Sequence, residues 1–82
     1  MNITEKFSET EYCNTVRINS SLEEIFLEFG VSIPTEKDLS VELNKRLAMN
    51  YFTAKRFALN LGNHLRAFEE EHGLIEINEV QK

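Results

Sequence analysis

The sequence predicts an α+β fold, in which a three-stranded antiparallel β-meander is followed by one long amphipathic helix. Two periodicities support this prediction. Apolar side chains recur at every second residue in three separate segments before residue 50, which is typical of half-buried strands. Apolar side chains then recur at steps of three and four from residue 54 to residue 72, which is typical of a helix.

The chain length sets the domain organisation. A chain of 82 residues accommodates one domain at most. The first residues mix Glu, Ser, Thr and Lys without a period, so we expect a flexible arm there. The predicted organisation is a flexible arm over residues 1–10, one α+β domain over residues 11–78 and a flexible tail over residues 79–82.

The three alternating segments are residues 12–19, 25–31 and 41–49. Asn19, Ser20 and Ser21 favour a turn after the first strand, because their short polar side chains bond their own backbone. Pro34 is expected to end the second strand, since proline has no N–H to donate and a fixed φ. Short connections of this kind predict an antiparallel meander.

The alternation gives the predicted sheet two different faces. On the mainly apolar face, Asn14 is expected to bond backbone groups near a strand end, and Lys45 suits an edge strand where its ammonium group reaches water. The opposite face is expected to be mostly solvated, and it carries Thr15, Arg17, Phe26, Glu28, Glu42, Asn44 and Arg46.

The predicted helix has recognisable signals at both ends. Asn50 is a good N-cap, and Gly73 can take the positive φ of a C′ residue. Between them one apolar stripe is formed, which we expect to cover the apolar face of the sheet; its members are Ala54, Phe57, Ala58, Leu61, Leu65, Phe68 and His72. The following LIEIN segment is expected either to add a short C-terminal strand or to stay irregular.

Composition indicates a small cytoplasmic protein that gains stability by self-association. Cys13 is the sole cysteine, so no internal disulfide can form, and no apolar run suggests a signal peptide or a membrane span. Small folds without disulfides or metals usually depend on tight helix packing or on oligomers. We therefore expect a bacterial, cytoplasmic protein that forms a homodimer.

Charge is distributed unevenly. The segment from Leu43 to Phe68 holds five of the nine basic residues and none of the fourteen acidic ones. The basic residues of this segment are Lys45, Arg46, Lys55, Arg56 and Arg66. The net charge of −5 argues weakly against a general nucleic-acid binder, because such domains tend to be basic overall.

Several segments together resemble the domain-of-unknown-function family 3467. The resemblance covers roughly residues 11–77. It includes "YCN" at the first strand, "SSLEEIFLEF" in the second, the following Pro34, and "RLAMN" leading into "AKRFALNL" and "FEEEHG". The chain departs from the family pattern at Tyr51, where proline is expected, and at His72, where an aromatic residue is usual. The resemblance implies the same architecture, and it implies no activity, substrate or catalytic residue.

One helix face is the main candidate for partner binding. Two apolar residues lie there among basic ones, on the side opposite the apolar stripe. The candidate partner-binding residues are Phe52, Lys55, Arg56, Leu59, Asn63 and Arg66 on the helix, with Arg46 on the sheet. An ordinary solvated face, a protein interface and a nucleic-acid surface are all compatible with this pattern. We favour a non-enzymatic protein-protein interaction module or accessory subunit, with a nucleic-acid-associated protein as the alternative.

Motifs for catalysis, metals and cofactors are weak throughout. His64 and His72 are too far apart for the i, i+4 spacing of a helical zinc site. Neither histidine is near Cys13 in the sequence, and the three glycines form no phosphate-binding loop. We therefore expect no catalytic residue, no metal and no cofactor.

Overall fold

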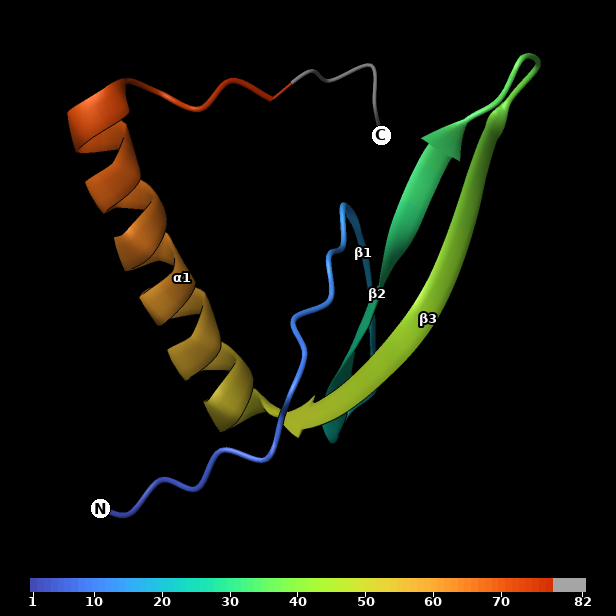
Figure 1. The fold of residues 1–82 in the computed structure, drawn as a ribbon. Helices are drawn as coiled ribbons and strands as arrows, with labels where there is room; N and C mark the ends of the chain where they lie inside the picture. Colours follow the sequence, from blue (N-terminus) through green and yellow to red (C-terminus); the bar gives the residue numbers. More distant parts are fainter. Residues whose placement is uncertain (78–82) are drawn as a thin grey trace. The chain divides into compact units, whose positions relative to one another are not determined.

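The computed structural model describes residues 1–77, which form three strands and one helix in the order β1, β2, β3 and α1 (Figure 1). The strands are β1 (Thr15–Ser20), β2 (Glu24–Pro34) and β3 (Leu39–Asn50), and the helix is α1 (Tyr51–His72). The chain divides into two compact units, Met1–Met49 with the sheet and Asn50–Lys82 with the helix. The predicted α+β order of three strands followed by one helix is confirmed.

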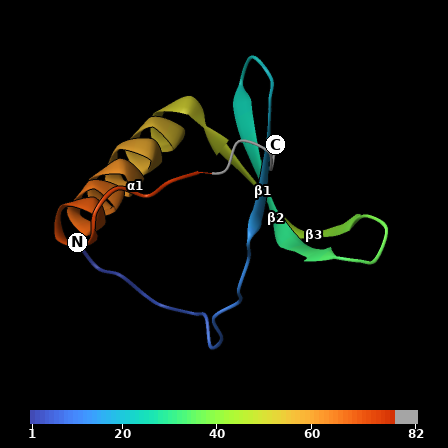
Figure 2. The same ribbon diagram turned by 90° about the horizontal axis from the view of Figure 1, so that it is seen from above.

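The sheet is a meander with β2 at its centre and β1 and β3 at its edges (Figure 2). β1 and β2 pair antiparallel with Val16 opposite Phe29 and Arg17 opposite Glu28. Both pairs match the predicted faces, because apolar residues meet on one side and charged residues on the other. Pro34 ends β2, as expected, and Lys45 lies on an edge strand.

Asn14 explains why β1 begins at Thr15 rather than at Tyr12. Its side-chain amide donates to the Ser32 carbonyl oxygen at 3.2 Å and accepts from the Ser32 backbone N–H at 2.7 Å. Continuing the register of Thr15 opposite Gly30 would place Cys13 opposite Ser32. The amide thus occupies backbone groups that residue 13 would otherwise pair with, which ends the ladder. The expectation that Asn14 bonds backbone at a strand end is confirmed.

β2 contains all the residues that are buried in the described part of the chain. These are Leu27, which is 5% exposed, Glu28, which is 8% exposed, and Gly30. Gly30 lies directly against the backbone of β3. A Cβ at this position would overlap the Glu42 carbonyl oxygen and stand 2.7 Å from the Leu43 Cα, so the strand approach requires glycine here.

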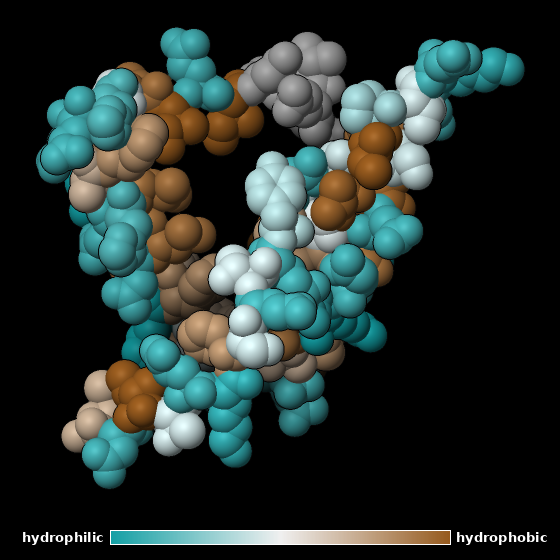
Figure 3. Space-filling view, in the orientation of Figure 1, coloured by the Kyte–Doolittle hydropathy of each residue, from teal (hydrophilic) through white to brown (hydrophobic). Residues whose placement is uncertain are grey.

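The ends of α1 match the sequence signals. The Asn50 side-chain oxygen accepts from the Thr53 backbone N–H at 2.8 Å, and Gly73 takes φ 92° while its N–H donates to the Glu69 carbonyl oxygen. The Glu69 carboxylate also accepts from the Ile75 N–H at 2.9 Å. The helix is two-sided, with apolar side chains along one side and polar ones along the other (Figure 3).

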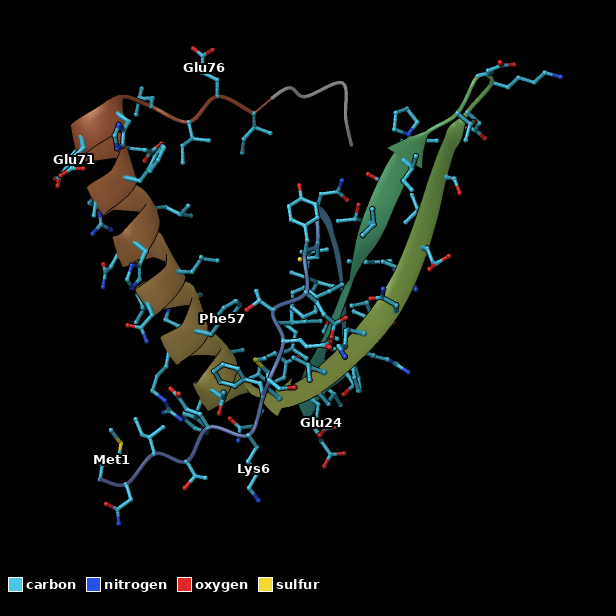
Figure 4. All side chains as sticks on the ribbon, viewed as in Figure 1. Met1, Lys6, Glu24, Phe57, Glu71 and Glu76 are labelled. Atoms are coloured by element: carbon cyan, nitrogen blue, oxygen red, sulfur yellow. The ribbon has the colours of Figure 1, made fainter. Side chains whose placement is uncertain are left out.

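The segments before β1 and after α1 contact the strands and the helix through specific polar groups. Residues 1–14 have no helix or strand, and Figure 4 shows Met1 and Lys6 projecting from this segment. Glu11 makes an ion pair with Lys45, with 2.9 Å between Oε2 and Nζ. Residues 73–77 form no strand, and the predicted tail over residues 79–82 lies outside the described residues. The covering of the sheet by α1 concerns two separate units and stays a prediction.

Gly30→Ala is expected to destabilise the protein, because an added methyl group must displace the backbone of β3. Overpacking of this kind costs roughly 1–3 kcal/mol or more. Gly62→Ala is the matched control, since a Cβ at residue 62 meets nothing within 4 Å and the helix interior gains about 1 kcal/mol from alanine. Urea unfolding of both variants measures the difference. An unchanged midpoint for Gly30→Ala would contradict the close strand approach.

Candidate interaction surfaces

The first candidate surface is the far face of α1, which we define by Phe52, Lys55, Arg56, Leu59, Asn63 and Arg66. These residues follow one another at steps of three, one, three, four and three, so at helical periodicity they share one side. Phe52 is 78% exposed and Leu59 is 58% exposed. The structure therefore leaves two large apolar side chains in solvent among three basic ones.

The charged groups on the far face are exposed. The Arg66 Nη1 donates to the Asn63 Oδ1 at 3.0 Å. This bond holds the guanidinium against the preceding helical turn. Lys55 and Arg56 are exposed in the first half of α1. No acidic residue occurs in the first turn of the helix. The far face is therefore positively charged near its N-terminal end, at Lys55 and Arg56, and again at Arg66 in the C-terminal half of α1.

Arg46 belongs to the sheet unit and has partners of its own. Its Nε lies 3.3 Å from Glu28 Oε2, and its guanidinium stands over the Phe26 ring at 4.8 Å from the centroid. On the other side of β2, Arg17 Nε donates to Glu28 Oε1 at 2.6 Å and Asn19 Nδ2 donates to the same oxygen at 3.0 Å. These five residues from three strands form the Glu28 cluster.

Among the described residues, Glu28 has the one buried side chain on a face of the sheet that is otherwise mostly exposed, as expected. The sequence shows polar residues there, but the carboxylate is covered by the two arginine side chains, which themselves stay more than half exposed. The Arg17 hydrogen bond lowers the pKa of Glu28, and the charges of Arg17 and Arg46 and the Asn19 bond act in the same direction. Desolvation raises the pKa and is outweighed, so the carboxylate is ionised at neutral pH.

The sequence predicts Arg46 as a partner-binding residue but does not show that Arg46 pairs with Glu28. That pairing depends on the strand register, which brings Arg17 opposite Glu28, and on the position of β3 beside β2. The usable signal was the alternation itself, because it places Arg17, Glu28 and Arg46 on the same face. Since both arginines are bound to one carboxylate, the cluster has a net charge of +1 rather than +2.

Two surface hollows lie on the sheet unit. One is lined by Arg17, Glu28, Leu43, Asn44, Lys45 and Arg46, and therefore belongs to the Glu28 cluster. The other is lined by Glu11, Tyr12, Cys13, Phe29, Asn44, Lys45 and Leu47. Cys13 is exposed, and none of the described residues lining this hollow is a histidine that could activate its thiol.

Residues 1–77 contain neither a cluster of metal ligands nor a membrane-spanning helix. In that range no three His, Cys, Asp or Glu side chains gather closely enough to hold a metal ion. Within the same range, no helix is both long and apolar enough to cross a membrane.

Comparison with known protein families gives a match over most of the chain. The model of a family described as a protein of unknown function (DUF3467) matches residues 1–77. Neither the curated proteins nor the solved structures include a match to the chain.

Glu28→Gln is expected to destabilise the sheet at pH 7 and to have a much smaller effect at pH 3. The lowered pKa means that the ionised carboxylate stabilises the folded state above the ordinary glutamate range, about pH 4.3, and that this contribution is lost as the pH falls through the folded-state value. The amide variant lacks this contribution at every pH. Urea midpoints at the two pH values measure the difference between the variant and the parent chain.

Glu42→Gln is the control for this measurement, because Glu42 is exposed on the neighbouring strand. It should match the parent chain at both pH values. A Glu28→Gln effect of equal size at pH 7 and pH 3 would show that the ion pairs do not stabilise the sheet.

Proposed function

We propose that this chain, which belongs to the family of proteins of unknown function DUF3467, acts as a non-enzymatic interaction module or accessory subunit. In this proposal it forms a homodimer and presents the far face of α1 to another protein. The observation that carries the proposal is the exposure of Phe52 and Leu59 within a ring of basic side chains. Apolar anchors bordered by arginine are typical of protein interfaces.

Self-association is supported by the small buried core. Leu27 is the one large apolar side chain that is buried in the described part of the chain, whereas many others are exposed in both units. Burying apolar surface is the main favourable term in folding and association. A second copy of the chain can bury this exposed apolar surface, because a two-fold symmetric dimer uses the same patch on both subunits.

The charge of the far face indicates the chemistry of its partner. Lys55, Arg56 and Arg66 are accompanied on this face by Asn63, which is neutral. A partner surface with acidic groups around an apolar pocket would complement it. The alternative of a nucleic-acid partner draws on the same residues together with Arg46. The pairing of Arg46 and Arg17 with Glu28 reduces what the sheet can offer to phosphates.

Phe52→Asp and Leu59→Asp are expected to abolish partner capture by the tagged protein at its natural level, while leaving the fold intact. Each substitution places a charge among apolar contacts on the far face. Leu22→Asp is the matched control, because Leu22 is also exposed but lies in the turn between β1 and β2. Quantitative mass spectrometry of the captured proteins compares the three variants with the parent chain.

Two results would contradict this proposal. A partner list that is unchanged by both far-face substitutions would remove the interface. Binding to a fluorescent oligonucleotide that weakens steeply with salt, and that is lost in Lys55→Ala and Arg56→Ala, would favour the nucleic-acid alternative.

A further inference from the structure

The apolar stripe of α1 has the spacing of a helix-pairing seam. Its central line consists of Ala54, Ala58, Leu61, Leu65, Phe68 and His72, at steps of four, three, four, three and four. This heptad spacing keeps a seam facing a second helix along its full length. The largest members are substantially exposed, with Leu61 at 46%, Leu65 at 44% and Phe68 at 52%. No residue of α1 is buried, so nothing within the helix unit itself covers the seam.

Side-chain size along the seam changes from one end to the other. The N-terminal half contributes Ala54 and Ala58, and the C-terminal half contributes Phe68 and His72, whose rings lie 4.6 Å apart between centroids. Two such helices in parallel would place alanine against alanine at one end and rings against rings at the other. One end would be underfilled and the other overfilled.

An antiparallel pair solves this size problem in every layer. With Leu61 of one copy against Leu65 of the other, heptad spacing places Ala58 against Phe68 and Ala54 against His72. Each layer then combines a small side chain with a large one, or two leucines. Because the pair is two-fold symmetric, each contact occurs twice.

The charges beside the seam fit the same arrangement. Lys55 and Glu69 flank the seam on one side, near opposite ends of α1. In the antiparallel pair Lys55 of each copy lies beside Glu69 of the other, which gives two attractive contacts. Antiparallel helices also place each positive N-terminal end beside a negative C-terminal end. Size and charge therefore point independently to one orientation.

We propose that two copies of this chain associate through the apolar stripe of α1 as an antiparallel, two-fold symmetric helix pair centred between Leu61 and Leu65. This inference rests on the homodimer of the proposed function and names its seam. It leaves the other far-face residues directed away from the seam, where they can meet a partner, and places Lys55 at the border between the two surfaces. The competing occupant of the stripe is the apolar face of the chain's own sheet.

The test uses two charge-reversed full-length chains, Lys55→Glu and Glu69→Lys, purified separately and then mixed. Alone, each variant has two like-charge contacts in its dimer and should dissociate. In the mixture, both contacts become opposite-charge pairs, so the mixed dimer should exceed either self-dimer by at least about tenfold at low salt. With one of the two chains uniformly labelled with ¹⁵N, native mass spectrometry separates the three species by mass.

Arg56→Glu and Glu70→Lys form the matched control pair. They make the same charge changes one residue further along the same helix, on the side away from the seam. Their mixture should give self-dimers and mixed dimers in statistical proportions. The Glu69→Lys chain also loses the Glu69 bond to the Ile75 N–H, twice in its self-dimer and once in the mixed dimer. This effect cancels when the mixed dimer is compared with the geometric mean of the two self-dimers.

Three results would overturn the inference. These are a parent chain that stays monomeric at high concentration, a dimer that Lys55→Glu leaves unchanged, and a mixing preference in the control pair instead. A monomeric parent chain that unfolds on Leu65→Asp would identify the sheet as the occupant of the stripe. Partner capture through Phe52 and Leu59 is measured separately, so a wrong seam and a wrong partner surface give different results.

Discussion

The sheet depends on β2, because this strand holds every buried residue of the described part of the chain. One of them is an ionised carboxylate, and burying an unpaired charge is costly. Arg17 from β1 and Arg46 from β3 reach Glu28 from either side, so the charge that would oppose folding connects all three strands. Gly30 contributes in a different way, by letting the backbone of β3 come close.

The sheet unit buries little apolar surface of its own. Ladder hydrogen bonds, the Glu28 cluster and the Asn14 amide contribute to its internal contacts, while apolar residues such as Val16 and Ile18 remain more than half exposed. The same holds for α1, in which no residue is buried. Exposed apolar surface of this extent on both units is the physical reason to expect association, and it is independent of any particular partner.

Local signals explain which parts of the fold the sequence could predict. The limits of α1 follow from Asn50 and Gly73, since each acts on backbone groups within a few residues of itself. The start of β1 could not be predicted from alternation, because it depends on Asn14 reaching Ser32 in another strand. Burial of Glu28 likewise requires the relative positions of three strands. The far-face residues could be predicted to share one side of the helix. The molecule that binds them could not, because it is a second molecule.

On each of two opposite sides of α1, a row of side chains follows heptad spacing. Only one of the two rows is suited to pairing with its own copy in a dimer. On the far side, Phe52, Arg56, Leu59, Asn63, Arg66 and Glu70 also follow steps of four, three, four, three and four. An antiparallel pair through this line would place Arg56 of one copy against Arg66 of the other, twice, and such like-charge contacts are unfavourable. The apolar stripe has no such conflict. In the proposed function the far side is therefore the surface for a different partner, since Phe52 and Leu59 are exposed there and acidic groups would complement its basic side chains.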